Sequence, residues 1–119
     1  MLKAALMHEL AITDEMIKLV VDQAGKAGMA KVEKINLIVG KLTGYVNESI
    51  QLYFDMMSKG TVAEGATLFF ETIPGKLECQ SCQKTFELSQ FDYICPGCNG
   101  VSVKLVAGNE LRVESIEGD

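Results

Sequence analysis

Apolar and polar residues recur along the chain with two different periods, and the longer period predicts two helices. From residue 10 to 24 the apolar positions follow helical spacing, and Gly25 comes directly after this run, as glycine often does beyond a helix C-terminus. A second run of helical spacing begins at Asn47, a residue type that commonly caps a helix N-terminus, and stops at Lys59-Gly60.

The shorter period predicts four strands. Residues 32–39 alternate and then turn wholly apolar up to Gly40, and residues 67–73 form a similar run before Pro74-Gly75. Residues 110–116 alternate cleanly, and residues 101–106 form a further strand before them. The pattern predicts an α+β fold, with two helices packed on a small mixed sheet.

The composition changes in residues 76–100, which hold all four cysteines, few aliphatic side chains and several turn formers. We expect this segment to form a zinc-ribbon-like lobe inserted before a last strand that returns to the main sheet. The predicted division is therefore an α/β lobe of residues 1–75 plus 108–119 and a cysteine lobe of residues 76–107.

The four cysteines form two pairs, Cys79-x-x-Cys82 and Cys95-Pro-Gly-Cys98, with twelve residues between the pairs. Two intervening residues allow a tight turn to direct both sulfurs at one ion, and two such turns complete a tetrahedron. A site of four thiolates favours zinc or an iron–sulfur centre. Because four cysteines leave no open position for water, a zinc ion bound here is predicted to be structural.

Disulfides and a mononuclear iron site of the rubredoxin kind are alternative uses of the same cysteines. Residues 1–7 are too short for a signal peptide, and the chain lacks the roughly 20 apolar residues that a membrane helix needs. We therefore expect a cytoplasmic protein that does not enter a membrane. Cytoplasmic thiols stay reduced or bind metal, which favours zinc over disulfides and leaves iron open.

The formal net charge of −5 argues against nucleic acid as a partner, since phosphate binding requires a basic stripe. The nearest approach to a stripe is Lys26, Lys31 and Lys34, which Glu33 interrupts. The chain also lacks a catalytic dyad and a nucleotide-binding glycine loop, so we do not expect an enzyme. A zinc-ribbon interaction module without further metal chemistry is the main alternative class.

His8 is the only histidine, and it precedes the first predicted helix. It is either a surface residue at a helix start or a ligand for a transition metal. Imidazole suits Ni(II) and Cu(II), which favour planar geometry with neighbouring amide nitrogens. A fraying first turn would let the backbone nitrogens of His8 and Glu9 reach such an ion. Periodicity and composition do not decide between the two.

Five short segments, taken in order, carry a resemblance to a known family. They are Met7-His8-Glu9-Leu10, Val39-Gly40-Lys41-Leu42-Thr43-Gly44, Glu64-Gly65-Ala66, the two cysteine pairs, and Gly108-Asn109-Glu110-Leu111. Together they resemble the HypA-type nickel metallochaperones of hydrogenase maturation, and the resemblance extends over nearly the whole chain from Met7. The first and last segments make it specific.

The resemblance implies a nickel-binding α/β lobe and a zinc lobe. It implies that Ni(II) is cargo, delivered to the large-subunit precursor of a nickel–iron hydrogenase together with a partner GTPase, whereas Zn²⁺ is a structural cofactor. By the motif match, His8 is the principal nickel ligand, with backbone nitrogens of Met7, His8 and Glu9 beside it.

The chain departs from the family pattern at its start. The methionine of Met-His-Glu is normally the first residue and offers its free amine to nickel, but here six residues precede Met7. We hypothesise that translation begins at Met7, or that the extension changes or weakens the nickel site.

Overall fold

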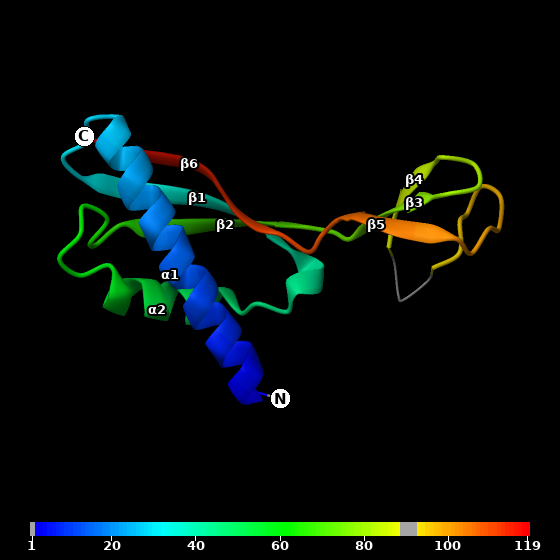
Figure 1. The fold of residues 1–119 in the computed structure, drawn as a ribbon, viewed down its shortest axis with the longest axis horizontal. Helices are drawn as coiled ribbons and strands as arrows, with labels where there is room; N and C mark the ends of the chain where they lie inside the picture. The colour runs from blue at the N-terminus through cyan, green and yellow to red at the C-terminus, as the bar shows by residue number, and fades with distance from the viewer. Residues whose placement is uncertain (1, 89–92) are drawn as a thin grey trace. The chain divides into compact units, whose positions relative to one another are not determined.

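The computed structural model describes residues 2–88 and 93–119, with side chains from His8 onward in the first helix. The elements in these residues are α1 (Leu2–Lys26), β1 (Val32–Gly40), the 3₁₀ turn η1 (Lys41–Thr43), α2 (Asn47–Met57), β2 (Thr67–Ile73), β3 (Lys76–Cys79), β4 (Thr85–Glu87), β5 (Val103–Ala107) and β6 (Leu111–Gly118) (Figure 1). This confirms the predicted α+β class. No helix in the described residues is long and apolar enough to cross a membrane.

The chain folds into two compact units. The main unit contains the chain up to Ile38, Gly44–Glu71 and Arg112–Asp119, and the small unit contains Val39–Thr43 and Thr72–Leu111. All four cysteines belong to the small unit. The cysteine-bearing segment therefore lies in the sequence between β2 and β6, and the chain returns for its last strand.

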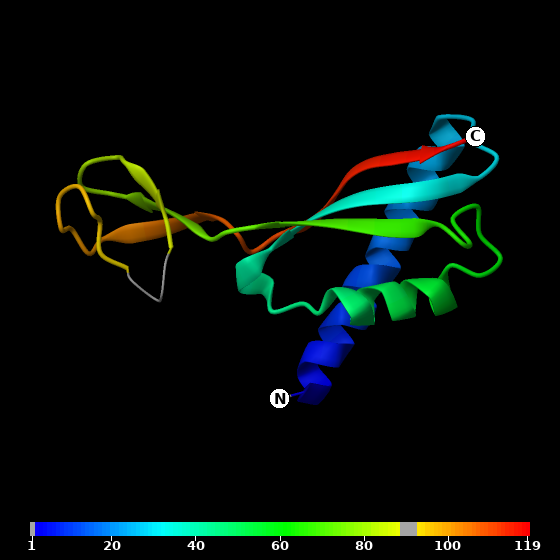
Figure 2. The ribbon, with the colours of Figure 1, turned by 180° about the vertical axis from the view of Figure 1, so that it is seen from behind.

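The main sheet has the strand order β2-β1-β6, so the first and last strands of the chain are neighbours (Figures 1 and 2). The Asp119 amide donates to the Lys31 carbonyl at 3.0 Å, and Asn36 Nδ2 donates to Ser115 Oγ at 3.0 Å. These partners run in opposite directions along the chain, so β1 and β6 are antiparallel. The return of the last strand to the main sheet was predicted from the sequence.

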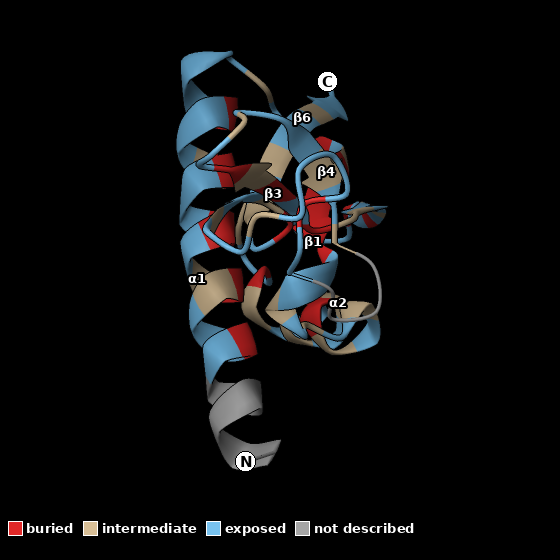
Figure 3. Ribbon diagram, turned by 90° about the vertical axis from the view of Figure 1, so that its right-hand side faces the viewer, coloured by how far each residue is buried: buried red, intermediate tan, exposed pale blue. Residues whose placement is uncertain are grey.

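The core of the main unit lies between the strands and one side of α1, which also packs against α2. Figure 3 shows the buried positions of α1 along one side of the helix. Burial of each valine, leucine, isoleucine, phenylalanine or methionine side chain contributes about 1.5–3 kcal/mol. Within the main unit, the buried apolar residues of these elements are Met16, Ile17, Val20, Ala24, Val32, Ile35, Leu37, Ile38, Ile50, Phe54 and Leu68.

Two sequence-based expectations about the helices were wrong. Helix α1 begins at Leu2 rather than near Leu10, so His8 and Glu9 lie inside the helix and not before it. The preceding residues are mostly alanine, leucine and methionine, which have high helix propensity and continue the helix without apolar periodicity. Asn47 is the first residue of α2, and Val46 holds the N-cap position without a side-chain cap.

Two glycines permit close backbone contacts in the small unit. A Cβ atom on Gly40 would overlap the carbonyl of Gly108, and one on Gly108 would overlap the Cα of Gly75. Gly108 also has a φ of +106°, which disfavours other residues. The amides of Gly40 and Leu42 donate to the carbonyls of Glu110 and Gly108, both at 2.8 Å, so the backbones are held together.

Substituting Gly40 by alanine is expected to lower the free energy of unfolding by about 1–3 kcal/mol, because the added methyl group meets backbone that cannot move aside. Gly25→Ala is the matched control, since nothing lies within 4 Å of its Cβ position and alanine favours the helix by about 0.5–1 kcal/mol. Urea unfolding measures both changes. Equal midpoints for parent and Gly40→Ala would contradict the close contact.

Candidate metal centres

Each cysteine pair lies in a turn of the same shape. The Gln83 amide donates to the Cys79 carbonyl at 2.9 Å, and the Asn99 amide donates to the Cys95 carbonyl at 2.9 Å. The residue after each pair has left-handed backbone, with φ of 65° at Gln83 and 59° at Asn99. The two turns therefore present their thiols in equivalent ways.

The equivalence continues into the flanking backbone. The Cys79 amide donates to the Lys84 carbonyl at 2.8 Å, and the Cys95 amide donates to the Gly100 carbonyl at 2.9 Å. The first turn joins β3 to β4, which pair antiparallel, and β3 also pairs antiparallel with β5. The short three-stranded sheet, ordered β4-β3-β5, thus positions the first pair of cysteines.

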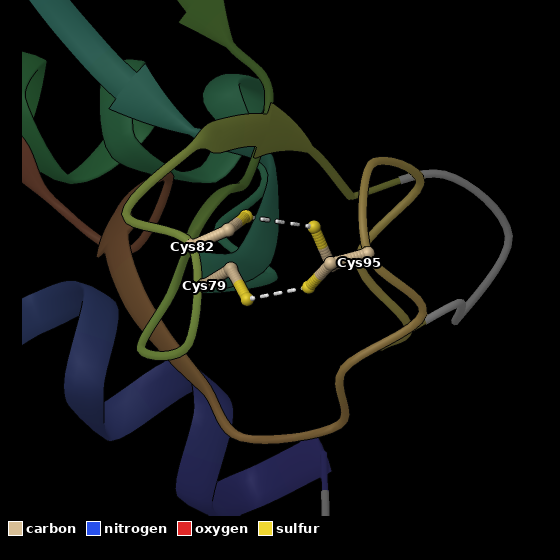
Figure 4. Close-up of side chains that lie close together, drawn as sticks. Cys79, Cys82 and Cys95 are labelled. Carbon is tan, nitrogen blue, oxygen red and sulfur yellow. Dashed lines mark hydrogen bonds between the residues drawn. The ribbon is translucent and has the colours of Figure 1, made fainter.

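The structure brings together the four cysteines that the spacing singled out. Their Sγ atoms all lie within 4.8 Å of one another, and Cys79 and Cys82 face the opposite turn that carries Cys95 (Figure 4). The Cys79–Cys98 and Cys82–Cys95 sulfur separations are 3.5 and 3.6 Å. A tetrahedral zinc thiolate with Zn–S bonds of about 2.3 Å requires sulfurs roughly 3.8 Å apart. The donor set and its spacing fit zinc.

The turn amides favour the charged form of two cysteines. The Cys82 amide is the main cause that lowers the pKa of Cys79 to about 6, against the opposing effect of burial. Burial opposes ionisation of Cys95, but the amides of Cys98 and Gly97, together with the Cys82 and Cys98 side chains, outweigh it and lower the pKa of that thiol too. Thiolates are the form that binds metal, so the turns prepare these sulfurs for zinc.

Cys98 behaves differently. The Gly100 amide favours its thiolate, but hydrogen bonds with the Cys79 and Cys82 side chains outweigh this and raise its pKa to about 12. Four neighbouring thiolates repel one another, so one sulfur keeps its proton when no cation is shared. A divalent ion that removes this proton and compensates the charge is the expected partner of the cluster.

Zinc retention is expected to decline on acidification. The pKa of Cys79 in the folded turn lies below its ordinary value of 9.0, so the stability from its thiolate is complete above pH 9.0 and is lost as the pH falls through about 6. Because zinc competes with protons for the sulfurs, we expect zinc to be retained near neutrality and to be released progressively on acidification. A colorimetric zinc chelator measures the release. A release midpoint above neutrality would contradict the claim that the turn amides stabilise the thiolates for zinc binding.

Sequence reasoning missed the contribution of the residue Gly100. A Cβ atom there would lie 3.2 Å from Cys98 Sγ and 3.4 Å from Cys79 Sγ, so a larger residue would crowd the two sulfurs. The asparagine at position 99, a type that tolerates left-handed backbone, was the available signal for the second turn. A glycine directly after it indicates nothing specific without the fold.

The candidate nickel residues lie in α1 of the main unit. His8 is exposed, whereas Glu9 is buried at 2% exposure, and the side chain of Met7 lies outside the described part of the structure. Glu9 Oε2 accepts a hydrogen bond from the Val46 amide at 2.6 Å, and Thr13 Oγ1 donates to the Glu9 carbonyl at 2.6 Å. The side chains of His8 and Glu9 therefore have different surroundings, one in solvent and one against α2.

The fraying first turn expected around His8 is not what the structure shows. His8 and Glu9 lie more than one turn inside α1, where backbone amides donate to carbonyls four residues earlier. Those amide nitrogens are unavailable to an ion while the helix is intact. Among the side chains that the structure describes, the only grouping of three or more metal-ligating types is the cysteine cluster.

Comparison with known proteins places this sequence close to one family. A family model described as "Hydrogenase/urease nickel incorporation, metallochaperone, hypA" matches residues 7–118. A "Hydrogenase maturation factor HypA" of Dehalococcoides mccartyi is 42% identical over 113 residues, which are 95% of each chain. Its namesake in Caldanaerobacter subterraneus is 40% identical over 112 residues, which are 93% of this chain and 98% of the relative.

Two solved structures share the fold. One is described as the solution structure of the Ni metallochaperone HypA from Helicobacter pylori, with a TM-score of 0.74, 25% identity, and coverage of 92% of this chain and 96% of that one. The other, described as the solution structure of HypA protein, has a TM-score of 0.78, 26% identity, and coverage of 94% and 96%.

Proposed function

Because this chain belongs to the HypA family of nickel-incorporation metallochaperones, we propose that it binds Ni(II) through His8 and delivers it to the large-subunit precursor of a nickel–iron hydrogenase, together with a partner GTPase. The observation that carries the proposal is the family match, which begins at Met7-His8-Glu9, the segment with the chain's only imidazole. The proposal assigns this chain no catalytic residue.

The proposal gives the cysteine cluster a structural role. Cys79, Cys82, Cys95 and Cys98 would hold one Zn²⁺, since their sulfurs lie within 4.8 Å of one another and two of them have a lowered pKa. Bound zinc would compensate the thiolate charge and crosslink the two turns. The four thiols would supply all ligands of the zinc ion, so we assign nickel to the main unit.

The exposed position of His8 suits a carrier that must release its metal. An imidazole at the surface is open to exchange with a recipient site, whereas a buried cage of protein ligands is not. Nickel coordination by the backbone nitrogens of Met7, His8 and Glu9 would additionally require these residues to leave the helix. The proposed nickel site thus requires the segment of α1 around His8 to unwind.

Removing residues 1–6 is expected to strengthen nickel binding roughly tenfold or more. The shortened helix would start at Met7, where amides of the first turn have no helical partner and the chain offers a free amine. Competition with a chromophoric chelator measures the affinity. A variant that lacks only residues 1–3 is the control, since His8 stays inside the helix there. Equal affinities for all three proteins would contradict this.

Delivery is tested in a purified reaction that contains the nickel-loaded chain, a metal-free hydrogenase large-subunit precursor and the partner GTPase. We expect nickel to appear in the precursor with the parent chain and to be absent with His8→Ala. Equal transfer by both chains would contradict His8 as the carrier residue. A parent that binds zinc but no nickel, with or without residues 1–6, would favour the alternative of a zinc-ribbon interaction module.

A further inference from the structure

Glu9 connects the proposed nickel segment to the start of the second helix. Its carboxylate is buried, and Oε2 accepts from the amide of Val46, the N-cap residue of α2, at 2.6 Å. In a capping box a glutamate three residues into the helix satisfies this same amide. Here α2 has Ser49 at that place, so the carboxylate comes from α1 instead.

The backbone of Glu9 is held as well as its side chain. Thr13, which is fully buried, donates from Oγ1 to the Glu9 carbonyl at 2.6 Å. The position of Glu9 is thus fixed at both ends of the residue, while the neighbouring His8 stays exposed. A charge-assisted hydrogen bond in a buried setting is among the stronger interactions of a small domain.

We propose that Glu9 is a positioning residue that opposes nickel binding. In the nickel-free protein it keeps α1 helical at His8, and when Ni(II) binds, its hydrogen bond with the Val46 amide breaks. This inference rests on the proposed function. Coordination by the backbone nitrogens of His8 and Glu9 takes them out of their helical hydrogen bonds and changes the backbone torsions of Glu9. The Glu9 carboxylate, which accepts from the Val46 amide at 2.6 Å, is expected to lose that contact in the change.

The nickel-bound and anchored conformations therefore exclude one another, and each opposes the other by the same factor. Nickel binding therefore removes a hydrogen bond from the N-cap of α2, so metal bound at His8 changes the stability of a second helix. Loss of the anchor, in turn, favours the open segment and strengthens nickel binding. A purely structural Glu9 would change stability without changing nickel affinity.

Amide hydrogen exchange, read by mass spectrometry in peptides that cover Val46, tests this on the zinc-loaded full chain with and without Ni(II). In the parent we expect protection of Val46 without nickel and its loss with nickel. In Glu9→Ala we expect that protection to be absent from the outset and nickel to bind about tenfold more tightly. Glu9→Gln keeps an acceptor oxygen and should resemble the parent, as should the exposed control Glu15→Ala.

The outcomes separate the two proposals. A parent that binds nickel while Val46 stays protected overturns the anchor and leaves the carrier function intact, and this comparison needs no variant to fold. An unchanged nickel affinity in a folded Glu9→Ala overturns it as well. A parent that binds no nickel, with or without residues 1–6, overturns the carrier function and the anchor together.

Discussion

Removal of zinc is expected to unfold the small unit while the main unit stays folded. In the described part of the small unit, the buried apolar side chains are Val39, Leu77, Cys79 and Cys95, so two of the four are themselves proposed ligands. Such a core supplies only a few kcal/mol, whereas structural zinc sites bind with about 10–16 kcal/mol. The main unit has a core of its own that contains no ligand of the cluster.

A strong chelator combined with residue-resolved hydrogen exchange measures this effect. We expect the amides of β3, β4 and β5 to lose protection after zinc removal, and those of residues 32–38 of β1 and the buried half of α1 to keep it. Cys79→Ser should behave like the chelated parent. Ser81→Ala is the matched control, because it changes an exposed residue of the same turn and leaves the four sulfurs. Protected amides at Cys79 and Cys95 without zinc would contradict the account.

Replacing His8 by alanine is expected to weaken nickel binding at least about 100-fold. Loss of an outer partner of a metal ligand alone costs about 10–100-fold, and His8 is the only imidazole in the chain. The fold should be unaffected, since His8 is exposed and surface substitutions usually change stability by less than about 0.5 kcal/mol.

Nickel affinity of His8→Ala is measured by chelator competition, and the absorption bands of Ni(II) report whether the ligand set has changed. Glu15→Ala, another exposed substitution in α1, should bind like the parent. Parent-like affinity and spectrum in His8→Ala would mean that nickel binds elsewhere. Unfolding curves of the two variants show whether any loss of binding comes from a loss of structure.

The strands of the main sheet were predictable because each is an alternating or continuous apolar run that ends at a glycine or proline or at the end of the chain. The expected strands at residues 32–39 and 67–73 coincide with β1 and β2 to within one residue. Strands β3 and β4, of four and three residues, were not predicted, because elements this short carry too little periodicity. Their position depends on pairing with β5 and on the cysteine turns rather than on local pattern.

The cysteine cluster and the nickel segment differ in how far the sequence could describe them. Spacing alone indicated that Cys79, Cys82, Cys95 and Cys98 converge, since each pair is a local turn. The prediction that His8 precedes the first helix was wrong, because residues of high helix propensity extend α1 back to Leu2. The contact between Glu9 and Val46 joins residues 37 positions apart, so only the packing of α1 against α2 reveals it.

The central claim is that one chain holds zinc in its cysteine cluster and carries nickel at His8. Metal analysis of tag-free protein after nickel exposure and dialysis tests it most directly, with parent and His8→Ala treated side by side. The account predicts zinc bound by the cysteines of both proteins and nickel only in the parent. Nickel retained equally by both proteins, or by neither, even after removal of residues 1–6, would contradict it.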